Sequence, residues 1–571
     1  MCGIAGVISV TSLPDIKETA QAMIQTISHR GPDGINIWTD EAKKISLAHA
    51  RLSIIDLSTI ANQPMHYQNG RYTIVFNGEI YNYVELRSHL LTKQYSFNSK
   101  SDTEVLLALF AEYREKCLAM LDGMFAFVIF DELSGELFCA RDRFGEKPFY
   151  YFHSQSKFLF ASEIKAIHKV EKLIGVNFNQ INSFLLDSGK YALYNHMFTN
   201  LAELAPGHFL WLKNGKTTIT KYYDVSLISA FAESTEVACI EKFNFLFTQS
   251  ITRRLRSDVT VGTSLSGGMD SSAIACKLAQ LNHENYATFT ARFPNHPKDE
   301  GYWVSKVIAQ TGYQNIEVYV DIDNTMHEID RIIYSQEHIP KSTSIFAQWY
   351  VMQTAQKHQV KVLLDGQGAD EYLSGYDHMK YFLIWQYYRD LHWLKLWHER
   401  SELKSKYDRK AKLGYLFLFD PLLNLFGKRR SIFNEGYTFK DRLVFALKHE
   451  LNELLHYADR SSMAHGIEIR LPFLSHELVE YCLSLPNHLL YRNGYNKYIL
   501  REACKPILPE EIYKRTLKIG FETSEDVWLK DKKITEKGKA AAEILRAYKI
   551  IPCTNHFLNM FAVSFINQFA R

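Results

Sequence analysis

Cysteine is scarce in this sequence, and no two cysteines are spaced to hold a metal. The chain has 8 cysteines in 571 residues, and none forms a C-x-x-C pair, so neither a zinc site nor a thioredoxin-type redox motif is indicated. A chain of this length buries enough apolar surface to fold without disulfide bonds. We therefore expect most of these cysteines to be small buried side chains in a reducing cytoplasm.

Long apolar runs and a strong net charge are also missing. The nearest candidate for a membrane span, Tyr415 to Phe426, is interrupted by Asp420. The mildly apolar residues Gly3 to Val10 follow no basic stretch, so no secretory signal is expected. Lys+Arg 66 against Asp+Glu 63 gives a net charge of +3, which does not indicate a nucleic-acid partner. We expect a cytoplasmic globular protein without an integral membrane segment.

The first 170 or so residues are typical of short strands and turns with a few helices. We expect one strand at Ile74 to Phe76, stopping at the turn residues Asn77-Gly78, and another at Phe125 to Phe130, a nearly continuous apolar run. Ser101 and Glu104 have the spacing of a capping box, so we expect a helix to begin there.

The pattern changes from about Phe243 onward. Long helical patterns there alternate with short apolar strands, such as Val259 to Leu265 and Val362 to Leu364. This alternation is typical of an α/β domain with a parallel sheet. The polar stretch around Lys213 to Glu236 is the expected link between the two parts.

The segment Ser266-Gly267-Gly268-Met269-Asp270-Ser271-Ser272 is the sharpest local motif. It follows the expected strand ending at Leu265 and precedes a helical pattern over Ile274 to Leu281. A strand, a glycine turn and a helix N-terminus together present backbone N–H groups to phosphate, whereas a bare SGG also fits a simple capped turn. The lysine of a Walker A motif is absent. The motif resembles the pyrophosphate-binding loop of N-type ATP pyrophosphatases, which implies ATP cleavage between the α and β phosphates, with Asp270 holding Mg²⁺.

Cys2 gains meaning from the segments that follow it. Removal of Met1 would place a thiol and an α-amine on one residue, and the amine, with a pKa of about 8, can act as the base for the thiol. The supporting segments are Cys2-Gly3-Ile4, His29 to Asp33, Arg51 to Asp56, Asn77 to Asn82, Ser101 to Glu104, and Ala140 to Gly145 with Lys147, Pro148 and Tyr150. They resemble the class II glutamine amidotransferase domain. With the SGGMDSS loop behind them, the chain resembles the glutamine-hydrolysing asparagine synthetase family over about residues 1–375 and 459–523.

The resemblance implies a glutamine site around Cys2. Cys2 would attack the side-chain amide and release ammonia, with Asn77 and the N–H of Gly78 forming the oxyanion hole. The implied glutamine-binding residues are Arg51, Leu52, Ser53, Ile54, Ile55, Asn77, Gly78, Glu79 and Asp102. Among these, Arg51 would hold the α-carboxylate, and Glu79 and Asp102 the α-ammonium. The alternatives are a surface charge for Arg51 and a helix-start carboxylate for Asp102. The segment His29 to Asp33 is expected to shape the fold.

The resemblance also implies a synthetase site. The implied ATP-binding residues are Leu265, Ser266, Gly267, Gly268, Asp270, Ser271, Ala291, Asp365 and Gly366, where Leu265 and Ala291 would contact adenosine through their backbones. The implied acyl-adenylate residues are Gln367, Asp370, Glu371 and Glu468, and the implied Mg²⁺ ligands are Asp270 and Asp370. In the family's SGEGxDE segment, Asp365 replaces the Ser and Gln367 replaces the first Glu. Ser475 replaces the Asp that closes the family's SMAxxLExRxPFLD segment. Glutamine cannot act as a base.

Two further segments match the family. Ser462 to Leu474 resembles its SMAxxLExRxPFLD segment, in which a buried ion pair between Glu468 and Arg470 is the alternative to a substrate role. Lys518 lies in a KxGF segment and is implied to be catalytic, by neutralising charge on the pyrophosphate side; a solvated basic loop is the alternative.

The implied fold combines α+β and α/β parts. Residues 1–205 would form an αββα Ntn-hydrolase sandwich and 206–240 a linker. Residues 241–525 would form a parallel-sheet ATP pyrophosphatase domain with a variable helical insert at 378–430, and 526–571 a helical extension. The insert is rich in aromatic residues and ends in Lys428-Arg429-Arg430, so a partner or membrane-surface role is the alternative to helices packed on the domain.

The implied reaction uses glutamine, ATP and Mg²⁺ to amidate a carboxylate, with aspartate the expected acceptor and asparagine the product. Family habit suggests a homodimer and a sheltered passage for ammonia. Gln367 and Ser475 favour a different carboxylate as an alternative, for example a uronic acid in a surface-polysaccharide pathway. Two further classes of protein share part of the pattern: a non-catalytic scaffold or regulatory homologue, and a tRNA-modifying pyrophosphatase. A non-catalytic homologue is expected to have lost catalytic residues, whereas this chain retains them. A tRNA-modifying pyrophosphatase leaves the N-terminal segments unexplained.

Overall fold

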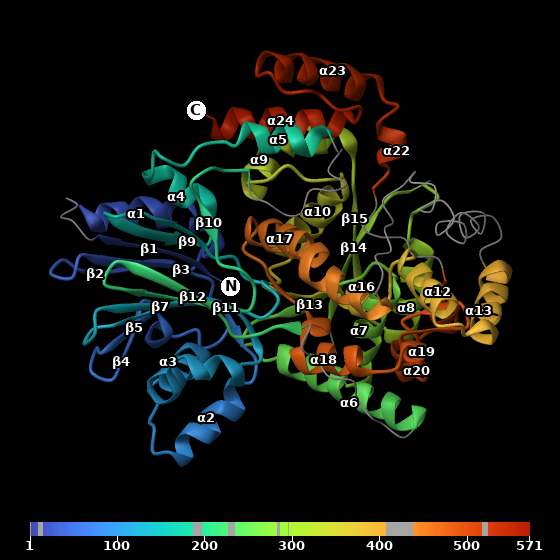
Figure 1. Ribbon diagram of the computed structural model, residues 1–571, viewed down its shortest axis with the longest axis horizontal. Helices are drawn as coiled ribbons and strands as arrows, with labels where there is room; N and C mark the ends of the chain where they lie inside the picture. The colour runs from blue at the N-terminus through green and yellow to red at the C-terminus, as the bar shows by residue number, and fades with distance from the viewer. Residues whose placement is uncertain are drawn as a thin grey trace.

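The computed structural model describes residues 2–9, 15–186, 197–225, 235–281, 286–294, 296–406, 438–516 and 523–570, with the backbone alone for 400–406 (Figure 1). We call residues 2–225 the N-terminal half and residues 235–570 the C-terminal half. Among the described residues, no helix is both long and apolar enough to cross a membrane.

The N-terminal half is an αββα sandwich, as predicted (Figure 1). One antiparallel sheet has the order β10-β8-β9-β1-β3-β2, and the other β12-β11-β7-β6-β5-β4. The first sheet consists of β1 Gly3–Ser9, β2 Gly34–Asp40, β3 Ile45–Arg51, β8 Tyr150–His153, β9 Lys157–Ala161 and β10 Ala202–Glu203. The second consists of β4 Met65–Tyr67, β5 Tyr72–Ile80, β6 Gly123–Asp131, β7 Glu136–Arg141, β11 His208–Lys213 and β12 Lys216–Lys221.

Apolar side chains fill the space between these two sheets. Ile4 and Leu47 of the first sheet share a buried cluster with Val75 and Val128 of the second. The outer faces are covered by helices: α1 Ile16–Thr26 and α4 Ile164–Val170 pack on the first sheet, and α2 Tyr83–Thr92 and α3 Asp102–Tyr113 on the second. The start of β1 therefore lies in a closed, water-poor layer.

Three local predictions differ from the structure. Strand β5 does not stop at Asn77-Gly78, because both residues remain paired with β6. Ser101 caps α3 by accepting from the N–H of Thr103, but Glu104 accepts from the N–H groups of Asn98 and Ser99, so no capping box forms. Residues 208–221, placed in a linker by the sequence, form two strands that extend the second sheet, so the N-terminal half runs beyond residue 205.

The C-terminal half contains a parallel five-stranded sheet with the order β15-β14-β13-β16-β17. Its strands are β13 Val261–Ser264, β14 Ala287–Arg292, β15 Gln314–Tyr319, β16 Val362–Leu364 and β17 Glu468–Arg470. Its principal helices are α6 Glu236–Arg254, α7 Met269–Gln280, α8 Gly301–Thr311, α9 Ile322–Gln336, α10 Ser344–Lys357, α11 Ala369–Tyr372, α17 Leu451–Met463, α18 His476–Ser484 and α20 Tyr498–Cys504. The chain adds strands outward from β13 on one side and then on the other. The carboxyl ends of β13 and β16 therefore flank the switch point, where open α/β sheets bind ligands.

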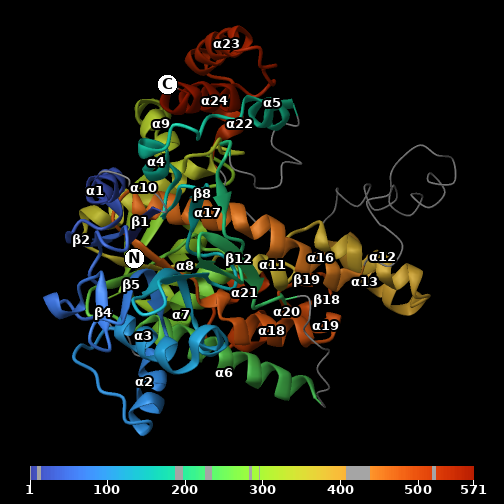
Figure 2. The same ribbon diagram turned by 60° about the vertical axis from the view of Figure 1, so that its left-hand side comes forward.

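Two helical additions complete the C-terminal half. Helices α23 Lys532–Ala547 and α24 His556–Phe569 form a hairpin beside α9 and beside α5 Phe178–Leu186 of the N-terminal half (Figure 1). In Figure 2, α12 Met379–Arg389 and α13 Trp393–Lys406 lie on the side away from the sandwich. They occupy the described part of the 378–430 segment; the basic residues 428–430 and the run 415–426 lie outside the described residues.

Candidate active sites

The residues implied to bind glutamine converge on one small cavity in the N-terminal half. Cys2 lies at the start of β1, Arg51 at the end of β3, Glu79 in β5 and Asp102 at the start of α3. The predicted residues that line the cavity are Cys2, Arg51, Leu52, Ser53, Ile54, Ile55, Gly78, Glu79 and Asp102. Four separate elements therefore bring the nucleophile and the predicted binding groups together.

Cys2 is held by Asn77 across the sandwich. The backbone nitrogen of Cys2 donates to Oδ1 of Asn77 at 3.0 Å, and the Sγ of Cys2 faces the carbonyl oxygen of Leu52 at 3.9 Å. Burial raises the pKa of the Cys2 thiol, so the free thiol is the resting form and must lose its proton to a base during attack.

Asn77 and Gly78 have the properties of an oxyanion hole. The Nδ2 of Asn77 is buried and, within the described ranges, has no hydrogen-bond partner, so two N–H bonds are available to a ligand. Gly78 has φ 155°, and a Cβ there would lie 2.1 Å from the carbonyl oxygen of Met124. Only glycine therefore fits where the backbone passes behind Cys2.

Arg51 is a buried, rigid cation rather than a surface charge. Its Nη1 donates to the carbonyl of Ser58 at 2.8 Å and to Oδ1 of Asn62 at 2.6 Å, and its Nη2 donates to the carbonyl of Asp56 at 2.5 Å. A guanidinium with fixed orientation suits a carboxylate ligand, because no side-chain entropy is lost when the ligand binds.

Two buried carboxyl groups, Glu79 and Asp102, line the same cavity as that cation. Burial raises the pKa of Asp102 to about 6, although its Oδ2 accepts from the N–H of Ile80 at 2.9 Å. Burial, and then the charges of Glu468 and Asp102, raise the pKa of Glu79 well above its usual range. A ligand ammonium group between Glu79 and Asp102 would restore both to the ionised form.

Some residues of this cavity were not found by sequence reasoning. Gln63, Phe76 and Thr103 also line it; Oε1 of Gln63 accepts from the N–H of Phe76 at 2.6 Å, and its Nε2 donates to the hydroxyl of Thr103 at 3.3 Å. Thr103 sits inside the SDTE segment that the sequence singled out, whereas nothing in the local sequence marks Gln63.

The glycine loop of the C-terminal half has the predicted strand–turn–helix geometry. It leaves β13 and enters α7 through Gly268, the N-cap residue. Gly267 has φ 70°, and a Cβ there would meet the Cβ of Trp303 at 2.7 Å. The hydroxyls of Ser266 and Ser271 lie 3.2 Å apart and hold the loop closed. The loop therefore presents the N-terminus of a twelve-residue helix at the switch point.

Two carboxylates predicted to bind Mg²⁺ converge on one cation. The Nζ of Lys497 lies 2.7 Å from Oδ1 of Asp270 and 2.6 Å from Oδ1 of Asp370. Both aspartates occupy first turns, of α7 and α11, which face each other across the switch point. The described residues contain no cluster of three or more metal-ligating side chains. A pair of carboxylates completed by phosphate oxygens is nevertheless a usual Mg²⁺ site, so the donor set fits.

The loop after β16 packs tightly against the glycine loop. A Cβ on Gly366 would lie 2.9 Å from the Cβ of Asp270, so glycine is required for this approach. Asp365 is buried, which raises its pKa, and its Oδ2 accepts from the Ser264 hydroxyl at 2.5 Å. The Oε1 of Gln367 is buried without a hydrogen-bond partner in the described part of the chain.

Leu265 and Ala291, which we predict to contact adenosine through their backbones, lie beside and within strands of the parallel sheet. The N–H of Leu265 donates to Phe289 at 2.9 Å, and its carbonyl accepts from the Thr290 hydroxyl at 2.7 Å; Ala291 follows in β14. Glu371 is buried and accepts from the Tyr376 hydroxyl at 2.6 Å. Lys518 lies outside the described residues.

Glu468 is found in the ion pair that the sequence offered as the alternative to a substrate role. Its Oε1 lies 2.5 Å from Nε of Arg470, and both side chains are fully buried. Arg470 in turn lies 3.6 Å from Glu79, which lines the glutamine cavity. This ion pair is the alternative that the sequence offered for Glu468, and its place in the acyl-adenylate site stays a prediction.

Comparison with known proteins matches both halves. Residues 1–223 match the family model described as glutamine amidotransferase domain, and residues 242–546 the model described as asparagine synthase. The chain is 31% identical over 569 residues to glutamine-hydrolyzing asparagine synthetase 1 of Bacillus subtilis, covering 93% of this chain and 88% of that protein. It is 28% identical over 579 residues to amidase chry2 of Gibberella zeae, covering 88% and 84%. Among solved structures, the glutamine PRPP amidotransferase of B. subtilis aligns with 64% of this chain and 81% of that one, at 15% identity and a TM-score of 0.30.

Proposed function

The chain belongs to the glutamine-hydrolysing asparagine synthetase family, and from that premise we propose that it amidates aspartate to asparagine at the expense of ATP. The chain is a glutamine-dependent amidotransferase with an asparagine synthase domain, that is, a carbon–nitrogen ligase. The observation that carries the proposal is the hydrogen bond from the Cys2 nitrogen to Oδ1 of Asn77, which leaves the buried Nδ2 of the same amide without a partner among the described residues.

In the N-terminal half, the Cys2 thiol attacks the side-chain carbonyl carbon of glutamine and passes its proton to the α-amine exposed by loss of Met1. The Nδ2 of Asn77 and the N–H of Gly78 stabilise the oxyanion. Collapse of the tetrahedral intermediate breaks the C–N bond, releases ammonia and leaves a thioester, and water then releases glutamate. Arg51 holds the α-carboxylate while Glu79 and Asp102 hold the α-ammonium.

In the C-terminal half, the backbone N–H groups around Gly267 and Gly268 bind the phosphates that become pyrophosphate. The acceptor carboxylate attacks the α-phosphorus of ATP, pyrophosphate leaves, and ammonia attacks the acyl carbon to give the amide and AMP. When bound, Mg²⁺ would neutralise negative charge on the phosphates, and Asp270 and Asp370 would hold it. Lys497 supplies a positive charge at the same place, and Lys518 is proposed to act on the pyrophosphate side.

A second acceptor class is supported by one observation. Gln367 replaces the glutamate of the family's SGEGxDE segment, so the side chain at this position is uncharged. Its Oε1 is buried and has no hydrogen-bond partner among the described residues. A larger or more polar carboxylate, such as a uronic acid, would be favoured if that oxygen accepts from a hydroxyl of the acceptor.

The deciding experiment measures AMP release with glutamine, ATP and a panel of carboxylic acids. Strong turnover with aspartate alone supports asparagine formation, whereas turnover with a uronic acid and none with aspartate replaces it by the second candidate. If none of the acids in the panel supports AMP release, both candidates are contradicted. The proposal includes a homodimer in the cytoplasm, supported by family habit; the mass measured by light scattering tests the dimer.

A further inference from the structure

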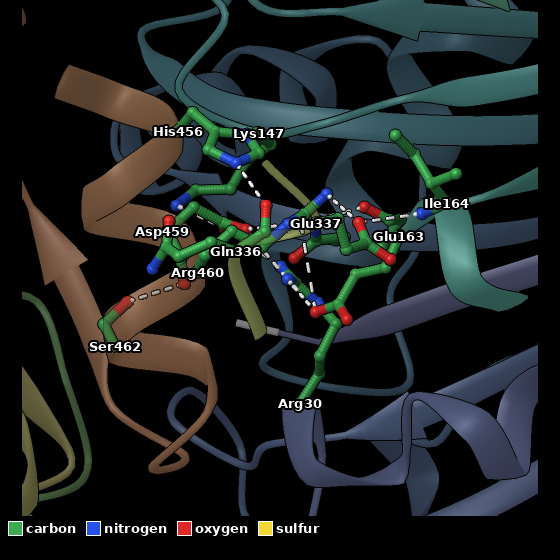
Figure 3. Close-up of polar contacts among 12 residues, drawn as sticks. Arg30, Lys147, Glu163, Ile164, Gln336, Glu337, His456, Asp459, Arg460 and Ser462 are labelled. Carbon is green, nitrogen blue, oxygen red and sulfur yellow. Dashed lines mark hydrogen bonds and ion pairs between the residues drawn. The ribbon is translucent and has the colours of Figure 1, made fainter. Parts of the chain in front are cut away.

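A buried ionic network joins the two halves (Figure 3). It also reaches the backbone of Cys2. Arg30 of the N-terminal half donates from Nη1 to Oδ2 of Asp459 at 2.8 Å and from Nη2 to Oδ1 at 2.9 Å. Asp459 lies in α17 of the C-terminal half, 429 residues away in sequence. The Nε of Arg30 donates to the carbonyl oxygen of Cys2 at 3.1 Å. One guanidinium therefore connects the nucleophile's backbone to the other half.

The network has little freedom to rearrange. Arg30 is fully buried, and its Nη1 also donates to Oε1 of Glu163 at 2.8 Å. Although burial alone would raise the pKa of Asp459, the charge and hydrogen bonds of Arg30 hold that pKa below its ordinary value, so the carboxylate is ionised at neutral pH. Because Nη1 and Nη2 of Arg30 both bind the carboxylate of Asp459, the planar guanidinium has one orientation. In that orientation its Nε points at the carbonyl oxygen of Cys2.

The same helix also contacts the segment that directly follows β9. The Nη1 of Arg460 donates to the carbonyl of Ser162 at 3.1 Å, and its Nη2 to Oε2 of Glu337 at 3.0 Å. Ser162 in turn exchanges backbone and hydroxyl hydrogen bonds with Ile4, two residues after the nucleophile. Helix α17 thus contacts the surroundings of Cys2 through Arg460 and through Asp459, and the path through Asp459 and Arg30 ends on the backbone of Cys2 itself.

We propose that Asp459 is a positioning residue for glutamine hydrolysis, acting through Arg30 on the carbonyl group of Cys2. The C-terminal half then holds the nucleophile of the N-terminal half in its reactive place. The inference rests on the proposed role of Cys2 as the glutamine nucleophile. Misplacement of a reacting atom by about 1 Å lowers a rate on the order of a hundredfold, so loss of this support affects the rate of attack.

The test compares Asp459→Asn with the parent protein in the full chain. We expect kcat for glutamine hydrolysis to fall at least about tenfold. The KM for glutamine is expected to change little, because neither Asp459 nor Arg30 lines the glutamine cavity. Ammonium-dependent amidation is expected to stay within a factor of about two, because the side-chain partners of Asp459, which are Arg30, Lys147 and Arg460, do not belong to the ATP site. Alkylation of Cys2 by the glutamine analogue 6-diazo-5-oxonorleucine should slow in parallel with hydrolysis.

Two variants separate positioning from simple cohesion of the halves. Glu85→Gln also replaces a carboxylate by an amide in a bidentate ion pair that joins the two halves. Its partner is Arg256, at 2.6 and 2.7 Å. This pair is more exposed than Arg30–Asp459 and does not contact Cys2. We expect it to leave hydrolysis unchanged. Arg30→Lys keeps the buried charge, but a single ammonium nitrogen cannot serve both Asp459 and the Cys2 carbonyl, so hydrolysis should fall as in Asp459→Asn.

The proposal is overturned if Asp459→Asn or Arg30→Lys hydrolyses glutamine within a factor of about two of the parent, or if Glu85→Gln slows hydrolysis as much as Asp459→Asn does. If Asp459→Asn fails to fold, as shown by loss of its cooperative melting transition, Arg30→Lys decides alone. Failure of the proposed function looks different: the parent protein itself would then hydrolyse no glutamine.

Discussion

The ammonium group of Lys497 lies 2.7 Å from the carboxylate of Asp270, at the place where the sequence predicts a magnesium ion. The sequence separation is 227 residues, and Lys497 has only 4% of its surface exposed. Without nucleotide and metal, a lysine at this place balances two carboxylates that would otherwise repel each other.

Replacing Lys497 by Met should make the protein depend on Mg²⁺ for its stability. The free energy of unfolding without Mg²⁺ is expected to fall on the order of 3 kcal/mol, because Asp270 and Asp370 lose their shared cation. Added MgATP should raise the melting temperature more in the variant than in the parent. Lys380→Met, which removes a buried lysine paired with Asp377 at 3.2 Å, is the control. An equal response to MgATP in all three proteins would contradict the prediction.

Replacing Cys2 by Ala should separate the two activities. Glutamine-dependent amidation is expected to disappear, because no thiol forms the thioester, while amidation with ammonium salts continues in the C-terminal half. Steady-state assays with each nitrogen donor measure this. Cys553→Ala, at a half-buried cysteine, should retain both activities. Loss of both activities in Cys2→Ala would argue against two separate sites.

Replacing Asn77 by Ala should slow glutamine hydrolysis without weakening glutamine binding in proportion. Loss of one oxyanion donor costs about 3 kcal/mol of barrier, which corresponds to a fall in kcat on the order of a hundredfold. Steady-state kinetics of glutamate release gives kcat and KM separately. A rise in KM with kcat unchanged would assign Asn77 to substrate binding instead.

The pKa of about 6 for Asp102 predicts how glutamine use varies with pH. The carboxyl group must be ionised to hold the α-ammonium of glutamine, so KM for glutamine should rise as the pH falls through about 6. Ammonium-dependent amidation should lack this step. A pH series of both reactions is the measurement, and a KM for glutamine that stays level from pH 8 to pH 5 would remove Asp102 from the binding site.

The same raised pKa has an opposite consequence for stability. A carboxyl group whose pKa is higher in the folded than in the unfolded protein destabilises the fold once the pH has risen through the folded value. Asp102→Asn should therefore be more stable than the parent at pH 8, by on the order of 3 kcal/mol, and similar to it below pH 4. Urea unfolding at the two pH values tests the sign. A variant less stable than the parent at pH 8 would contradict it.

Local sequence was enough to predict much of this protein. The chemical types of Cys2, the Asn-Gly pair and the SGGMDSS loop define what each half can do, because each motif carries its geometry within a few residues: a terminal thiol, adjacent amide donors, or a strand that turns into a helix. The alternation of helices and strands likewise predicted the parallel sheet, and the family resemblance implied the sandwich. The expected end of β5 at Asn77-Gly78 was wrong because pairing with β6, a long-range interaction, overrides the turn preference of that dipeptide.

What the sequence by itself determined was therefore the set of reactive groups and the class of each half. Only the tertiary structure decided which distant side chains surround those groups. Lys497 between two aspartates, Arg470 beside Glu79 and Asp459 behind Arg30 belong to contacts that span hundreds of residues. The Lys497 contacts follow from packing within the C-terminal half, and the other two from the packing of one half on the other. No spacing along the chain encodes them, because a buried charge finds its partner through space rather than through sequence.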